Sequence, residues 1–393
     1  MGIIAADIIE FEKVKQSFDK SLGVHANGDY YPQKVERIIA ASPTAQRCTN
    51  EFRKTLIGRA FAGELNEFIV NSDGTNLRKF LRKICISYAI HRGAFIHINY
   101  NANYNIYSAK VLPYSHCLVG KKDDNDWAGK VCVYDNWAGD NGSFDKKKIS
   151  VIDVFNPKKE VIKAQITKAG GIDKYKGQIL FFNPDETTYP LAKLHSVLDD
   201  ADSERQSSIF KNKSLRKGFF GKKVAITPPM IDGDLRYEAK LSDEQLSLRS
   251  RQISERDNFR GTIKSFLGVD NIDGVMHLEM ELEGDDIEKT IKFIDIQTNI
   301  NDKLFAHTEE SVTQNIVAAS GVPAILVRPS DSSIFGNSGE LLKQARIYYQ
   351  SQCEEDISNI ENEILMPIMR EFEGFSMPQG GLKIQPLILN EIS

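Results

Sequence analysis

The spacing of apolar residues changes along this chain of 393 residues and separates a first half from a second half. From Pro32 to Ala60 and from Leu77 to Ile90, apolar residues recur at roughly helical steps, which predicts helices in both stretches. From Ala94 to Asn103 the pattern alternates, as it does in a half-buried strand. The first half is therefore expected to be an α+β unit, with helices first and a meander of strands after them. The further strands expected are Ser108–Leu112, Cys117–Gly120, Lys130–Tyr134, Ile149–Phe155 and Gln178–Phe182.

In the second half the helical period returns in two long segments that flank a small insertion. The first segment begins at Pro190 and predicts a helix of about 25 residues, which is long for a globular domain. The second begins at Ile294. The insertion between them contains strand candidates at Lys223–Thr227 and Gly274–Leu282. Ser242 opens a short helix there with a capping box, in which side chains satisfy free backbone N–H groups.

A glycine- and serine-rich loop joins the last two helical segments and is the most distinctive stretch of the chain. Before the loop, Gly321 is expected to end a helix as a left-handed C-cap, and Pro323 prevents its continuation. After the loop, Asn337 is expected to cap a final helix in register with Glu340. Pro367 is expected to kink or end that helix, because proline lacks the backbone N–H that a helix interior needs.

Composition indicates an ordinary folded protein with two or three substructures. The hydrophobic fraction is 41% and the charged fraction 26%, and a chain of this length can bury a sizeable core. The five cysteines are odd in number and scattered, which favours buried, reduced thiols in a cytosolic setting. No run of about 18 apolar residues occurs, so no membrane span is expected.

The sequence contains no signature of a catalytic, cofactor or metal site. It lacks a phosphate-binding P-loop, a dinucleotide-binding glycine motif, zinc-ligand spacings of histidine or cysteine, and a nucleophile elbow. Two carboxylate clusters, Asp123–Asp126 and Asp199–Asp202, could in principle serve a two-metal nuclease. We interpret them as a solvated turn and an exposed helix face, and the nuclease hypothesis stays open as an alternative.

Charge is distributed unevenly along the second half of the chain. The net charge of −4 argues against tight binding of nucleic acid over the whole surface. A local basic run consists of Arg205, Lys211, Lys213, Arg216, Lys217, Lys222 and Lys223. Cations at a helix C-terminus stabilise its dipole, but seven exceed that need, so a surface for phosphate or for a partner is an equal possibility. An acidic run consists of Glu279, Glu281, Glu283, Asp285, Asp286 and Glu288. It is either a solvated face or the complement of the basic run in a neighbouring subunit.

The order of these elements and several short motifs resemble the portal protein family of tailed bacteriophages. Ser311–Pro323 resembles that family's helix ending in a GVP turn, and Phe335–Glu340 resembles its loop and following helix start. Asn359–Ile368 resembles its closing helix around a proline. Upstream, Ile84–Ile98 resembles its passage from helix to strand, and Leu112-Pro113 the motif after it. The resemblance extends over roughly residues 30 to 375.

This resemblance implies an α+β, portal-like protomer with an α/β wing, two long stem helices, a small α+β clip and a kinked C-terminal wing helix. The implied parts are an N-terminal arm (1–30), wing (31–189), stem helix (190–218), clip (219–293), stem helix (294–322), tunnel loop region (323–339), wing helix (340–375) and a short tail (376–393) that leaves a minimal crown. The residues implied to face DNA are Arg328, Ser330, Asp331, Ser332, Ser333, Ile334, Phe335, Gly336, Asn337 and Ser338.

The implied function is a ring, commonly of about twelve subunits, at one vertex of the capsid. Double-stranded DNA would be packaged and ejected through it, and the terminase large subunit and a head–tail adaptor would dock on it. Contact with the major capsid or scaffolding protein is also implied, in a virion assembled in the bacterial cytoplasm. No enzymatic activity and no cofactor are expected. The alternatives are a metal-dependent DNA-processing enzyme and another structural phage protein, such as an adaptor or minor capsid protein.

Overall fold

The computed structural model describes residues 31–120, 129–135, 137, 149–185, 189–216, 223–227, 230–232, 235, 241–267, 275–279, 292–295, 302–328 and 338–388. The chain divides into two units, one of Met1–Arg205 with Ser311–Ser393 and one of Gln206–Glu310. The expected N-terminal arm (1–30) lies outside the described residues.

The first unit begins with helices, as the apolar spacing predicts, but the first stretch is broken in two. Helix α2 (Tyr31–Ala41) is followed by α3 (Pro43–Ile57), and α4 (Leu77–His91) comes next. The single helical stretch expected from Pro32 to Ala60 is therefore wrong at Ser42, because the residue before a proline is pushed out of the helical region. Ser42 is extended, and its Oγ accepts a hydrogen bond from the Ala45 N–H at 3.1 Å, which caps α3.

A six-stranded sheet follows, with the strand order β2-β1-β6-β5-β4-β3. The strands are β1 (Ala94–Tyr100), β2 (Ile106–Leu112), β3 (Cys117–Val119), β4 (Lys130–Val133), β5 (Ser150–Val154) and β6 (Gln178–Phe182). Short 3-10 turns are Gly63–Glu67, Tyr114–His116, Ile172–Lys174 and His195–Val197. All six strands lie close to their predicted positions, which confirms the α+β class.

The expected meander is wrong at two connections. The consecutive strands β2 and β3 lie at opposite edges of the sheet, and β5 and β6 are not antiparallel. Strands β5 and β6 are parallel, and helix α5 (Lys159–Ala169) crosses between them, whereas the other neighbouring strands are antiparallel. Parallel neighbours need a crossover of this kind. The sequence pattern does not reveal α5, because only Ile162 and Ile166 of its residues are buried.

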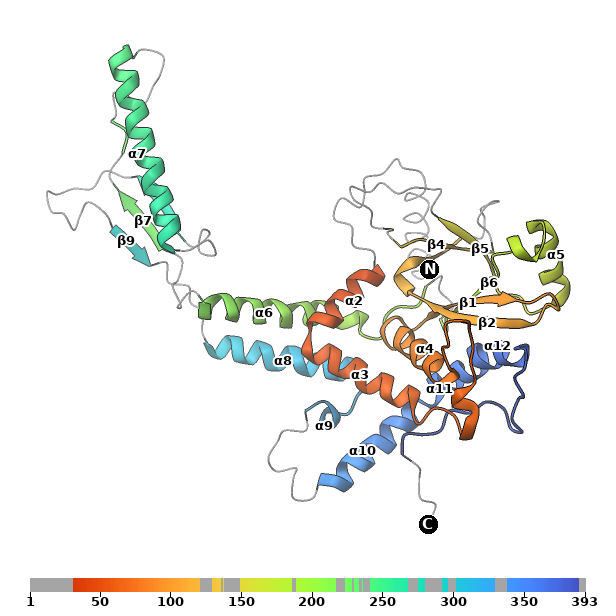
Figure 1. Cartoon of the computed structure of the whole chain (residues 1–393). Coiled ribbons are helices and arrows are strands. Elements are labelled where there is room, and N and C mark those ends of the chain that lie inside the picture. The colour runs from red at the N-terminus through yellow and green to blue at the C-terminus, as the bar shows by residue number, and fades with distance from the viewer. Residues whose placement is uncertain are drawn as a thin grey trace, which may run out of the picture. The chain divides into compact units, whose positions relative to one another are not determined.

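The sheet carries apolar side chains on both faces because alternate residues of β1 and β6 point in opposite directions. Ile96 and Ile98 join the main core with residues of α2, α3, α4 and the C-terminal helices. Phe95 and Ile179 join a smaller cluster on the other face. Helix α4 lies beneath β1 and β2 in the view of Figure 1. All five cysteines are buried and form no disulfide, as predicted.

The C-terminal part of the first unit contains four short helical segments where one kinked helix was expected. They are α10 (Ser338–Gln352), α11 (Glu354–Asn359), a π-helix (Ile360–Leu365) and α12 (Met366–Arg370). Pro367 stands in the first turn of α12. Its ring would clash with the carbonyl four residues before it in an α-helix, and the wider π turn that precedes it accommodates this.

The two long helices begin later than the apolar spacing predicts. Helix α6 spans Leu198–Arg216 rather than beginning at Pro190, and α8 spans Asp302–Ser320 rather than beginning at Ile294. In the first case the chain before Leu198 is not helical until a 3-10 turn at His195–Val197. In the second, Lys292–Asp295 forms strand β9 instead. Both helices cross the boundary between the two units.

The second unit contains a three-stranded sheet and a long helix. The sheet has the order β8-β7-β9, with β7 (Lys223–Thr227) parallel to β8 (Val275–Glu279) and antiparallel to β9. Helix α7 (Asp243–Leu267) has 25 residues, so the prediction of a short helix there is wrong. Its predicted capping box is confirmed, because the Ser242 N–H donates to Gln245 Oε1 at 3.0 Å. Among the described helices of both units, none is long and apolar enough to cross a membrane.

Candidate functional site: the supports of segment 328–338

The segment expected to face DNA runs between helix α9 (Ala324–Val327) and α10. Arg328, which follows α9, is exposed, and Ser338 is the first residue of α10. The other predicted residues, Ser330, Asp331, Ser332, Ser333, Ile334, Phe335, Gly336 and Asn337, lie outside the described residues, as does the predicted cap at Asn337. The described parts of the site are the two supports on either side of this segment.

The support before the segment is the GVP turn, which has the predicted geometry. Gly321 has φ +71°, the left-handed conformation that glycine adopts most easily, and it ends α8. The Ser320 hydroxyl donates to Val317 O at 2.7 Å and accepts from the Val322 N–H at 3.1 Å. Val322 itself is buried. These bonds turn the chain sharply from α8 into α9.

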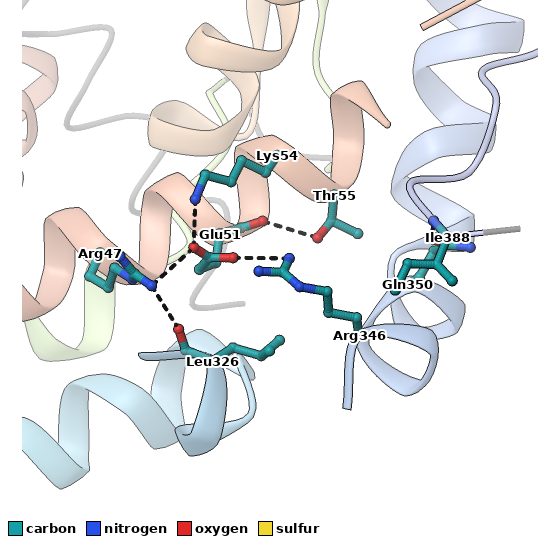
Figure 2. A network of polar contacts seen from close by, with 8 residues as sticks. All are labelled: Arg47, Glu51, Lys54, Thr55, Leu326, Arg346, Gln350 and Ile388. Atoms are coloured by element: carbon teal, nitrogen blue, oxygen red, sulfur yellow. Dashed lines mark hydrogen bonds and ion pairs between the residues drawn. The ribbon is translucent and has the colours of Figure 1, made fainter. Parts of the chain in front are cut away.

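A buried carboxylate on α3 lies between the two supports. Glu51 is only 1% exposed, and its Oε1 lies 2.8 Å from Lys54 Nζ and 3.6 Å from Arg47 Nη2. Arg346 of α10 approaches its Oε2 at 3.3 Å. Figure 2 shows the three cations converging on this one side chain. Glu51 Oε2 forms no hydrogen bond in the described part of the chain, so its contact with Arg346 is an attraction between opposite charges.

Arg47 connects the same carboxylate to α9. Its Nη2 donates to the carbonyl oxygen of Leu326 at 3.3 Å, and the Leu326 side chain is buried. Helix α9 packs against α3 and α10. Both ends of segment 328–338 are therefore tied to α3, one through Arg47 and the other through Arg346.

Apolar packing holds α10 in the same place. Tyr349 is 2% exposed, and Cys353 is buried one turn later. The ammonium of Lys193 lies 3.6 Å from the ring centre of Phe52 on α3 and 6.0 Å from that of Tyr349. Burial lowers the pKa of Lys193, and the two ring faces partly offset the cost of burying its charge.

The C-terminal segment supports α10 and α3 from a further direction. The Ile388 N–H donates to Gln350 Oε1 of α10 at 3.3 Å. Just after α3, the Arg59 N–H donates to Gln385 O at 2.9 Å and the Gln385 N–H donates to Ala60 O at 2.7 Å. The last described residues therefore connect the helix that follows segment 328–338 to the end of α3.

At its N-terminus, α3 also binds the first turns of α6. The Thr44 N–H donates to Glu204 Oε2 at 3.2 Å, and the Thr44 hydroxyl donates to Glu204 Oε1 at 2.7 Å. The Ser42 hydroxyl donates to the same carboxylate. A carboxylate here satisfies free N–H groups and complements the helix dipole. Helix α3 thus contacts α6, α9 and α10, which makes it the common anchor of the site.

The predicted basic residues have structural partners where the structure describes them. Arg205 forms an ion pair with Asp202 at 3.0 Å, and Lys211 forms one with Glu309. Lys213 and Arg216 lie on α6 and Lys223 on β7, but their side chains, and the whole of Lys217 and Lys222, are outside the description. Of the predicted acidic residues, Glu279 ends β8, and Glu281, Glu283, Asp285, Asp286 and Glu288 lie outside the described residues. The roles of both sets stay predictions.

The carboxylate clusters weighed for a nuclease are only partly described. Asp200 accepts a hydrogen bond from Asn315 Nδ2 at 3.4 Å, and Asp202 pairs with Arg205. Asp123–Asp126 lies outside the described residues. Within the part of the chain that the structure describes, no three His, Cys, Asp or Glu side chains are grouped so that they could hold a metal ion.

Sequence reasoning missed Glu51 and Arg346 as parts of the site. A signal for Glu51 is present, because it lies within the apolar stripe of α3, beside Phe52 and three residues after Cys48. A charged residue in such a stripe is seldom fully buried without a partner. Its partner Arg346 is equally placed in the stripe of α10, between Ala345 and Tyr349. Nothing in the sequence links the two.

Comparison with known proteins connects this fold to solved structures of a gene transfer agent particle. A solved structure described as the neck of an empty gene transfer agent (GTA) particle, computed with C6 symmetry, is similar at 14% identity and a TM-score of 0.50, covering 93% of this chain and 86% of that chain. A structure of the virion of the native GTA particle is similar at 13% identity and a TM-score of 0.50, with the same coverages of 93% and 86%. At these identities the likeness shows a shared fold.

Other comparisons add less. A crystal structure of an HK97-family phage portal protein from Corynebacterium diphtheriae is similar at 10% identity and a TM-score of 0.37, covering 78% of this chain and 81% of that chain. No family model matches the chain, and no curated protein matches its sequence. The comparisons therefore show a fold shared with the GTA structures, and the resemblance to portal proteins that the motifs indicate is a proposal.

Proposed function

We propose that this protein is a structural subunit of the portal type, a component of a phage or phage-like virion. Its copies form a ring at one vertex of the capsid, and double-stranded DNA passes through the ring during packaging and ejection. The fold shared with a GTA neck over 93% of the chain supports this proposal. The structure of the GTA neck was computed with C6 symmetry, and this symmetry is compatible with a ring in that particle.

The observation that carries the proposal is the anchoring of segment 328–338 at both ends. A loop that faces moving DNA needs rigid supports, and the Glu51 network supplies them on α9 and α10. Within 328–338, Arg328 and Asp331 are the charged residues, so the segment has no net charge. Each lysine or arginine engaged with phosphate adds salt-dependent affinity, so a neutral loop lets a duplex slide.

The parts of the chain take their roles from this proposal. Residues 31–189 and 340–375 form the wing, α6 and α8 the stem, and 219–293 the clip. The terminase large subunit and the head–tail adaptor dock on the ring, through the clip, and the wing lies against the major capsid or scaffolding protein. A ring of identical subunits needs two complementary faces. The basic run and the acidic run are proposed as these faces.

The test is a mass measurement on the purified full-length protein, combined with a nuclease assay. We expect an assembly of about twelve copies and no magnesium-dependent cleavage of duplex DNA. A monomer that cuts DNA would overturn the proposal and favour the metal-dependent enzyme.

A second candidate is another structural protein of the neck, such as an adaptor. The similar GTA structure favours this candidate, because it is described as a neck. Binding of the purified ring to the terminase large subunit separates the two, because a portal docks the packaging motor and an adaptor binds the portal instead.

A further inference from the structure

The first unit contains a cavity that the proposed function does not use. It lies between β5, α5 and the loop before β6, and its volume is about 430 Å³. Three lysines line it: Lys168 at the end of α5, and Lys174 and Lys176 in the loop. Asp153 and Gln165 line it as well. The cavity is open to solvent and large enough for a small polar ligand.

The charges around the cavity leave an excess of positive charge. Asp153 forms an ion pair with Lys130, and this pair neutralises the carboxylate that lines the cavity. Lys168, Lys174 and Lys176 are exposed, and among the described residues none of them forms an ion pair. The surrounding stretch, residues 157–177, contains six lysines against Glu160 and Asp173. An anion entering the cavity would therefore meet three uncompensated ammonium groups.

A chain of hydrogen bonds orients a further donor. The Asn156 N–H donates to Gln178 Oε1 at 3.0 Å, which makes that atom the acceptor and leaves Gln178 Nε2 as the donor. Gln178 Nε2 then donates to Gln165 Oε1 at 2.7 Å, and so does the Tyr175 hydroxyl. With its oxygen occupied twice, Gln165 has its amide N–H₂ group left for a ligand in the cavity.

The loop that carries Lys174 and Lys176 has a fixed shape. Gly177 has φ +78°, and a Cβ there would lie 2.2 Å from the carbonyl oxygen of Ile98 in β1. The ring Nε2 of His97 forms a hydrogen bond with the carbonyl oxygen of Lys176 at 2.7 Å. The backbone beside the lysines is therefore held against the sheet, so less order has to be gained on binding.

We propose that this cavity is a binding site for phosphate groups. Lysine binds phosphate as a compact point charge, whereas recognition of a planar carboxylate favours the bidentate fork of arginine, and the cavity contains lysines and no arginine. The ligand is either the phosphodiester backbone of a nucleic acid or a soluble polyphosphate. The site is independent of segment 328–338 and of ring formation.

A purely structural role for the same lysines makes a different prediction. Lys168 lies in the last turn of α5, and Lys174 lies close to Gly170 at its C-terminus, so both could merely stabilise the helix dipole. In that case their replacement would lower the stability of the fold and leave phosphate binding unchanged. Lys176 lies outside the helix, so its replacement separates the two roles.

The experiment compares two triple variants of the full-length protein. One replaces the cavity lysines (Lys168→Gln, Lys174→Gln, Lys176→Gln), and the matched control replaces three exposed lysines elsewhere in the first unit (Lys34→Gln, Lys79→Gln, Lys83→Gln). Binding of a short labelled duplex is followed by fluorescence anisotropy and binding of tripolyphosphate by calorimetry. Thermal unfolding checks that each variant is folded. If the cavity triple is not folded, the single variant Lys176→Gln is used in its place.

For the cavity triple, we expect the Kd for at least one phosphate probe to rise tenfold or more. For a duplex, the salt dependence should also fall by up to about three counter-ion equivalents. The control triple should change Kd less than threefold. The probe that responds identifies the source of the phosphate. Equal losses in both triples, no binding of either probe, or tighter binding of an acidic glutamate peptide than of both probes would overturn the proposal.

Discussion

Two carboxylates, Glu51 in the first unit and Glu309 in the second, form polar networks that connect helices. Glu51 is 1% exposed and is approached by three cations from α3 and α10. The side chain of Glu309 on α8 is 36% exposed, and it accepts hydrogen bonds from Lys211 and Ser207 of α6. The chemistry is similar, but the surroundings differ.

Burial decides which of these contacts can hold a segment in position. A buried carboxylate has no water to replace its partners, so breaking its pairs leaves an uncompensated charge. An exposed pair is screened and exchanges its partners for water at little cost. We therefore infer that the supports of segment 328–338 depend on Glu51 and its packing. The ion pair of Glu309 lies on an exposed helix surface and contributes little to positioning.

The largest effect is expected from the packing beside the Glu51 network. Tyr349 and Tyr348 are neighbours on α10, 2% and 59% exposed respectively. Tyr349→Ala should lower the free energy of unfolding by about 3–5 kcal/mol, because it leaves a cavity in the core. Tyr348→Ala should change it by no more than about 0.5 kcal/mol. Denaturant unfolding measures both, and equal losses would contradict the burial described for α10.

A smaller loss is expected for the carboxylate itself. Glu51→Gln keeps the shape but removes the charge that holds Arg346, so it should cost about 2 kcal/mol. Hydrogen exchange should become faster in α9 and α10, because both are tied to α3 through this side chain. The control is Glu355→Gln, an exposed residue of α11. If exchange in α9 and α10 stayed unchanged, the Glu51 network would not be their anchor.

The smallest effect is expected at Glu309. Hydrogen bonds from Lys211 and then Ser207 hold the pKa of Glu309 below its ordinary value of 4.5. A lowered folded pKa gives stability that is present above the unfolded value and lost as the pH falls through the folded one. Glu309→Gln should therefore cost less than about 1 kcal/mol at neutral pH, since the pair is exposed. The difference from the unsubstituted protein should shrink below pH 4.5 and in high salt. A difference that grew in acid would show that this linkage is wrong.

The strands of the first unit could be predicted because their alternation is local. Phe95 and Ile96 point to opposite faces of the sheet, and turn residues separate the strands that follow. Helix α5 could not be predicted, since two buried isoleucines give too weak a stripe in a mostly exposed helix. Phe293-Ile294 fits a helix or a strand equally well, and only pairing with β7 makes it strand β9.

The site shows the same division between local and distant information. The GVP turn was predictable because glycine and proline act on their own backbone, and Gly321 has the expected left-handed conformation. The Glu51 network was not, because its members come from helices far apart in the sequence. Their meeting depends on the packing of α9 against both α3 and α10.

Electron microscopy of the purified full-length protein shows directly whether its copies form a ring. We expect closed rings of about twelve subunits with an open central channel, formed without any other protein. Dispersed monomers, or open filaments without a closed ring, would contradict the assignment of this chain as a portal-type subunit.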